Sequence, residues 1–119
     1  MNCLYVITKG FEKSGGATRA MQFAALAAEA GNKVEVALID DAIHWAQLGM
    51  AEGIRSTTGE DMSEMIGRLV KKGGRLHVCK ACADKRYVDP DDILQGAEIK
   101  GGQQIVQIMT DPEYRVFVF

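Results

Sequence analysis

The sequence predicts an α/β fold whose parallel sheet is covered on both faces. The first observation is a pair of nearly continuous apolar runs, residues 4–8 and 34–39, which is the pattern of buried parallel strands. The second is the alanine-rich segment at residues 17–30 between them, which is long enough to be a helix that connects two such strands. Strand, helix and strand in this order make a β-α-β unit, which defines the class.

The connections in the first half of the chain follow from glycine and polar residues. A polar, glycine-containing segment, residues 9–16, leads from the first strand into the helix. Gly31-Asn32 provides the left-handed backbone conformation that is expected to end this helix. Residues 42–48 have a weak helical pattern, and residues 50–58 are expected to form an irregular loop.

The second half contains a helix, two strands and two further helical segments. Asp61 to Glu64 resembles a capping box, and apolar residues follow at helical spacing until Gly73. The remaining predicted elements are a strand at 75–79, a short helix that starts at Asp89-Pro90 and ends at Gly96, a helix from Gly101-Gly102 through Met109, and a strand at 114–119.

Length and composition predict one soluble domain, residues 1–119. The chain is 47% hydrophobic and 25% charged, as expected of a globular protein. Fourteen basic and sixteen acidic side chains give a net charge of −2, so direct binding to nucleic acid is not expected. We find no signal peptide and no apolar stretch near the ~18 residues of a membrane span. Three cysteines, an odd number, are expected to be free thiols in the reducing cytoplasm.

Two cysteines, Cys79 and Cys82, are the main candidates for chemistry. Cys79 is the last residue of the predicted strand 75–79. In open parallel sheets, ligands and catalytic groups collect at the carboxyl ends of the strands. If residues 80–84 begin a helical turn, Cys82 lies close enough to Cys79 for thiol exchange. We therefore predict that the two thiols act together.

A reactive thiol needs a lowered pKa, because the thiolate is the nucleophile. Lys80, Lys85 and Arg86 are nearby cations, and Arg86 is the better anchor for a sulfur anion because its charge is permanent. His77 shares the strand face of Cys79 by the two-residue period, so proton exchange with the thiol is one hypothesis.

Other interpretations compete with a thiol site. Cys3, inside the first strand, is expected to be a packing residue. A single Cys-x-x-Cys is half of a zinc site, but no second pair exists, so no metal is expected. A thioredoxin motif would follow the first strand rather than the third. Gly15 and Gly16, before the first helix, form a possible anion-binding turn, although the plain helix entry is the simpler interpretation.

Nearly the whole chain resembles the DsrE/DsrF-like family, which includes the TusD-type sulfur-relay subunits. The resemblance is most specific from Ile66 to Phe119. Lysine-glycine before a strand, the cysteine at its end, a nearby arginine, "GAEIKGG" and a terminal apolar strand occur there in family order. It implies a three-layer α/β/α sandwich with a five-stranded, mostly parallel sheet, and homo- or hetero-oligomers such as trimers and hexamers. It also implies intracellular sulfur transfer, with Cys79 at the position of the persulfide cysteine and Cys82 matching a second cysteine of some branches.

The leading hypothesis is a small cytoplasmic sulfur carrier, similar to a sulfurtransferase, that needs no cofactor. In it Cys79 forms the persulfide, Cys82 assists or resolves, and Arg86 with Lys80 stabilises the anion. Its expected partners are sulfur donor and acceptor proteins. One alternative is a non-catalytic oligomeric module that binds a small anion or nucleotide at Gly15-Gly16. Another is a thiol redox protein that cycles a Cys79–Cys82 disulfide.

Overall fold

A five-stranded parallel sheet forms the centre of the molecule. The computed structural model describes residues 1–119. All four pairs of neighbouring strands are parallel, and the strand order is β4-β3-β2-β1-β5. The strands are β1 (Asn2–Ile7), β2 (Lys33–Leu38), β3 (Arg75–Cys79), β4 (Ala97–Lys100) and β5 (Tyr114–Val118). The predicted α/β class and the five parallel strands are confirmed.

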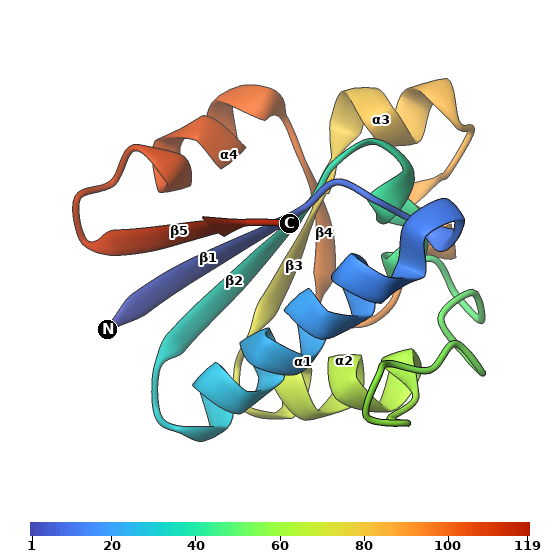
Figure 1. Cartoon of the computed structure of the whole chain (residues 1–119). Coiled ribbons are helices and arrows are strands. Elements are labelled where there is room, and N and C mark those ends of the chain that lie inside the picture. The colour runs from blue at the N-terminus through green and yellow to red at the C-terminus, as the bar shows by residue number, and fades with distance from the viewer.

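Helices lie on both sides of this sheet. Figure 1 shows α1 and α2 on one face and α4 on the other, so the structure has three layers. The short helix α3 directly follows β3 at the carboxyl ends of the strands. The helices are α1 (Ser14–Glu29), α2 (Met62–Lys71), α3 (Lys80–Lys85) and α4 (Gly102–Met109), with 3-10 turns η1 (Phe11–Lys13), η2 (Asp40–Ala46) and η3 (Pro90–Asp92). None of the helices is long and apolar enough to cross a membrane.

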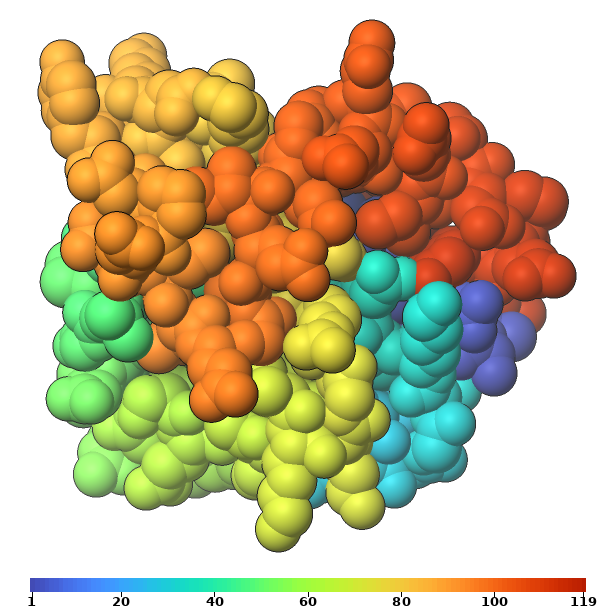
Figure 2. Space-filling model, turned by 180° about the vertical axis from the view of Figure 1, so that it is seen from behind, coloured from blue at the N-terminus to red at the C-terminus, as the bar shows by residue number.

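The two faces of the sheet are covered unequally. Alternate strand residues such as Val36 and Leu76 point to the side of α1 and α2, where 26 buried residues form the main core. On the other side, Leu4 and Ala37 pack with Ile105 of α4 in a cluster of only four buried residues. Seen from behind in Figure 2, residues coloured cyan, around β2, reach the surface beside α4 and β5. The second face is therefore thinly covered.

Local signals in the sequence account for the main helix boundaries. Gly31, at the end of α1, has a φ of 97°, and its N–H donates to the carbonyl of Ala28. Glycine adopts this left-handed conformation without steric cost, so the chain can reverse direction there into β2. Asp61 caps α2 by accepting a hydrogen bond from the backbone N–H of Ser63.

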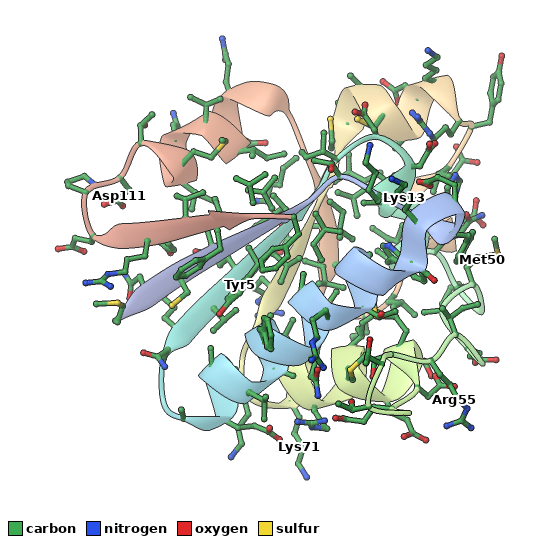
Figure 3. The ribbon with its side chains drawn as sticks, viewed as in Figure 1. Tyr5, Lys13, Met50, Arg55, Lys71 and Asp111 are labelled. Atoms are coloured by element: carbon green, nitrogen blue, oxygen red, sulfur yellow. The ribbon has the colours of Figure 1, made fainter.

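Three elements differ from the prediction. The first helix begins at Ser14 rather than at residue 17, so its first turn includes the predicted connection. The short helix expected after Asp89 is a single 3-10 turn, because the chain extends again at Ile93. Strand β4 was not predicted from the residue pattern; it is a short edge strand that pairs only with β3. Residues 50–58 are turns at the periphery, as Met50 and Arg55 show in Figure 3.

Candidate functional site

The two candidate cysteines lie where β3 changes directly into α3. Cys79 is the last residue of β3 and the N-cap of α3, and Cys82 lies within α3. Figure 3 shows the side chains at the junction of β3 and α3 as sticks, with sulfur atoms in yellow. The turn η2, which follows β2 at the same edge of the sheet, contacts α3. The predicted position at the carboxyl end of a strand is confirmed for Cys79.

The two thiols have different surroundings. Cys79 is partly exposed, whereas Cys82 is only 8% exposed. Burial and the interaction with the neighbouring Cys79 thiol raise the pKa of Cys82 to about 11. Cys82 is therefore a protonated thiol at neutral pH. Both cysteines are free, and so is the buried Cys3 of β1, whose predicted packing role the main core confirms.

Asp40, the first residue of η2, holds the buried thiol. Its backbone N–H donates to Cys82 Sγ at 3.0 Å, and Cys82 Sγ donates to Asp40 Oδ1 at 3.6 Å. Asp40 has a φ of 52°, in the left-handed region that non-glycine residues rarely adopt. Asp40 directly follows the predicted strand 34–39, and nothing in the sequence pattern indicated a contact with Cys82.

Arg86 joins α3 to the same turn. Its Nε and Nη2 lie 2.9 Å from Asp41 Oδ1, and its Nη1 donates to the carbonyl oxygen of Cys82 at 3.3 Å. Lys80 is exposed and forms an ion pair of 2.7 Å with Asp84 on the next turn of α3. Both predicted anion-binding cations therefore have a carboxylate partner in this structure.

A third cation, Lys100, lies beside Cys79 on the sheet. The two residues are direct partners in the parallel pairing of β3 with β4, so their side chains leave the same face. Lys100 is about one quarter exposed and lies 3.1 Å from Glu98 Oε2. Lys100 could not be predicted as a neighbour of Cys79 from the sequence, because the edge strand β4 that carries it has no clear apolar pattern.

His77 is buried on β3 and pairs with a residue other than Cys79. Its Nε2 lies 2.7 Å from Glu35 Oε1, and its Nδ1 has no partner in the structure. Burial opposes ionisation of Glu35, but hydrogen bonds from Tyr114 and His77 outweigh it and hold the pKa of Glu35 below its ordinary value. His77 shares a strand face with Cys79, as predicted, but forms no hydrogen bond with its thiol.

The predicted anion-binding glycines, Gly15 and Gly16, lie in a different helix from the thiols. Gly15 and Gly16 are exposed in the first turn of α1, and no hydrogen bond links them to Cys79 or Cys82. No cluster of three or more His, Cys, Asp and Glu side chains is arranged to hold a metal ion.

A groove of about 370 Å³ lies at the opposite end of β3 from Cys79. Its apolar walls come from α2 and from the segment before β4, and they include Val70 and Leu94. Arg75, the first residue of β3, lines it as well. The thiols consequently lie at the edge of the sheet and outside this groove.

The fold and the thiol pair define a class: a small α/β protein with paired cysteines at the carboxyl edge of a parallel sheet. The model of the DsrE/DsrF-like family matches residues 1–119, so the chain belongs to the DsrE/DsrF-like family. Membership is consistent with sulfur relay at the level of the family.

Solved structures agree with this assignment in fold. The structure of YchN from E. coli superposes with a TM-score of 0.85 at 19% identity, covering 100% of this chain and 99% of that chain. MTH1491 from Methanobacterium thermoautotrophicum has a TM-score of 0.70 at 18% identity, covering 99% of this chain and 98% of that chain. A comparison with curated protein sequences finds no match.

Proposed function

We propose that this protein is a small sulfur carrier, similar to a sulfurtransferase, in which Cys79 holds the transferred sulfur as a persulfide. The observation that carries this proposal is the asymmetry of the pair: Cys79 is accessible at a strand end, whereas Cys82 is buried and protonated. A carrier thiol must reach both the donor and the acceptor. Of the two cysteines, Cys79 meets this requirement.

The transfer follows ordinary thiol–disulfide chemistry. The Cys79 thiolate attacks the terminal sulfur of a persulfide on the donor protein, forming a new S–S bond. The S–S bond of the donor breaks, and the donor leaves as a thiolate. The persulfide on Cys79 then passes its terminal sulfur to a nucleophile on the acceptor, which regenerates the Cys79 thiolate. No net oxidation occurs and no cofactor is needed.

Cations near Cys79 stabilise the anionic forms in this proposal. Lys100 is the neighbour of Cys79 across the sheet, and its ammonium group pairs with Glu98. Lys80 and Arg86 keep the roles expected from the sequence only if their carboxylate partners, Asp84 and Asp41, share them with the sulfur anion. Lys100 has a carboxylate partner as well, and it is the one of the three that strand pairing places directly beside Cys79.

A thiol redox cycle is the second candidate function. It is supported by the interaction between the Cys79 and Cys82 side chains, which raises the pKa of Cys82. A Cys79–Cys82 disulfide would need an external oxidant. Mass analysis separates it from the carrier, because a disulfide lowers the protein mass by two hydrogen atoms and a persulfide adds one sulfur atom.

The location of transferred sulfur can be determined directly in the wild-type protein. Lys80 lies between the two cysteines, so tryptic cleavage places Cys79 in peptide 76–80 and Cys82 in peptide 81–85. After incubation with a low-molecular-weight persulfide and alkylation, we expect one reductant-sensitive sulfur in peptide 76–80. Protein alkylated beforehand is the control. Sulfur in peptide 81–85 would reverse the assignment, and sulfur in neither peptide would refute the carrier.

The proposal includes self-assembly and exchange with sulfur donor and acceptor proteins in the cytoplasm. Free thiols are typical of a reducing compartment. Assembly is supported by exposed apolar side chains around the edge strand β5, namely Phe23, Leu26, Phe117, Val118 and Phe119. The ring of Phe119 lies 6.4 Å from that of Phe23 on the α1 side of β5, and Val118 leaves the opposite side of the strand. Exposed apolar side chains gathered around one sheet edge are typical of a protein interface. We propose a second copy of the chain as its occupant.

We expect the wild-type protein to sediment as an oligomer and Val118→Lys to shift it toward the monomer. Val118 is 66% exposed, so the lysine disturbs an interface without entering the core. Leu48→Lys is the matched control, because Leu48 is 56% exposed and lies away from β5, after η2. Analytical ultracentrifugation measures the result. A monomeric wild type at micromolar concentration would contradict self-assembly.

A further inference from the structure

Cys82 is fixed by a single residue from a distant part of the chain. Asp40 contacts the sulfur twice, through its backbone N–H at 3.0 Å and its carboxylate at 3.6 Å. The backbone of Asp40 adopts the left-handed conformation that directs the N–H to the sulfur. A strained backbone of this kind persists only where surrounding contacts maintain it. Here the contacts include Cys82.

The turn that carries Asp40 is braced against α3 on its other side. Asp41, the next residue, binds the guanidinium of Arg86, which also donates to the carbonyl oxygen of Cys82. The titratable and charged groups around Cys82 are therefore Asp40 and Asp41 on η2, Cys79 on β3 and Arg86 at the end of α3. Asp40 and Cys79 are the two that act on the sulfur atom itself.

The position of Cys82 creates a hazard for a carrier. If Cys82 were a thiolate, it could attack the inner sulfur of a Cys79 persulfide and form the Cys79–Cys82 disulfide. The bond between the two persulfide sulfurs would break, and the terminal sulfur would leave as hydrosulfide. The proton of Cys82 has already passed to solvent in the ionisation that precedes this attack. This discharge needs no external oxidant, because the persulfide is itself reduced.

We propose that Asp40 is a positioning residue: it holds the Cys82 thiol turned toward η2, and its carboxylate disfavours the Cys82 thiolate, so that Cys82 does not discharge the Cys79 persulfide as hydrosulfide. This inference rests on the proposed function of Cys79. The carboxylate of Asp40 opposes a second negative charge on the sulfur and accepts its proton in a hydrogen bond. The N–H of Asp40 favours a thiolate, and the pKa of Cys82 is raised in spite of it, chiefly by burial and by the Cys79 thiol, with a smaller contribution from the Asp40 carboxylate.

Asp40→Asn tests the role of the carboxylate. Asparagine tolerates the left-handed conformation and keeps the backbone N–H, while its side chain is neutral. Asp40→Gly is the second variant, because glycine adopts this conformation freely. Asp91→Asn is the control for charge, since Asp91 is exposed on η3. Thermal unfolding confirms that each variant is folded.

The first measurement follows hydrosulfide release from proteins loaded with a low-molecular-weight persulfide and freed of excess donor. We expect roughly threefold faster release from Asp40→Asn and Asp40→Gly. Without the carboxylate the pKa of Cys82 falls, and the thiolate fraction that releases hydrosulfide rises, tenfold for each full pKa unit. The released sulfur should match the amount of Cys79–Cys82 disulfide, and Cys82→Ser should abolish the increase. Equal release from wild type and both Asp40 variants would overturn the inference.

The second measurement does not depend on sulfur loading. In the Cys79→Ser background, the rate of Cys82 alkylation as a function of pH reports the pKa of Cys82. Asp40→Asn is expected to move this profile to lower pH, and Asp91→Asn is expected to leave it unchanged. An unchanged profile in Asp40→Asn also overturns the inference. If the wild type accepts no sulfur but the alkylation profile of Asp40→Asn is shifted to lower pH, the carrier proposal is wrong, whereas the effect of the Asp40 carboxylate on the Cys82 thiol is supported.

Discussion

Serine in place of Cys79 is expected to reduce sulfur uptake from a persulfide donor to the level of alkylated protein. A serine hydroxyl is not ionised at neutral pH and forms no persulfide, so the acceptor atom is lost. Cys82→Ser is expected to retain uptake, because Cys82 is buried and its partner Asp40 can bind the serine hydroxyl in the same two ways. Comparison of the two serine variants therefore distinguishes the cysteine that carries sulfur from the one that only assists.

The measurement is the intact mass of each variant under non-reducing conditions, before and after reductant. Both variants keep the overall fold in our expectation, and circular dichroism checks this. If Cys82→Ser loses uptake and Cys79→Ser keeps it, the roles are reversed. If both single variants keep uptake, neither thiol is essential and the carrier mechanism is wrong.

Trp45→Ala is expected to lower the free energy of unfolding by about 3–5 kcal/mol, the usual cost of truncating a large buried aromatic residue. Trp45 is fully buried in the main core, and its ring meets Phe11 edge-on at 4.8 Å. Its indole N–H donates to the carbonyl of Lys9 at 2.8 Å, which fastens η2 to the segment after β1. The loss is a large fraction of the ~5–15 kcal/mol typical of a domain.

Urea unfolding followed by circular dichroism measures this effect. Leu48→Ala is the matched control, because Leu48 is three residues further on and 56% exposed, and it is expected to change stability by no more than about 0.5 kcal/mol. Trp45→Phe should fall between the two, since it keeps most of the apolar contact and loses the hydrogen bond. Equal unfolding free energies for Trp45→Ala and Leu48→Ala would show that η2 is held by other contacts.

The fold could be predicted wherever the chain carries a strong local signal. The strand 75–79 was predicted with the bounds that the structure has, because a short apolar run lies between Gly74 and polar residues. Strand β4 gives no such signal: its sequence, Ala-Glu-Ile-Lys, is half charged, and no residue in it is fully buried. Pairing with β3 holds this strand in place, and pairing between segments is not visible in a local pattern.

Only the part of the site that lies within one short segment of the chain could be predicted from the sequence. Cys79 and Cys82 stand three residues apart, so their proximity followed from the sequence. Asp40 contacts Cys82 from 42 residues away, and Lys100 reaches Cys79 through the unpredicted strand β4. The partners of Arg86 and His77, which are Asp41 and Glu35, come from segments just as distant. Tertiary contacts of this kind decide where each cation lies relative to the thiols and which thiol is buried.

Because Asp40 contacts Cys82 from another part of the chain, the Cys79-x-x-Cys82 segment cannot keep its properties when it is removed from this fold. A synthetic peptide of residues 75–86 would contain both cysteines and Arg86, but it would lack the N–H and carboxylate that come from η2. The different surroundings of the two thiols are thus a property of the assembled sheet edge, and a Cys-x-x-Cys segment grafted onto another scaffold would not retain them.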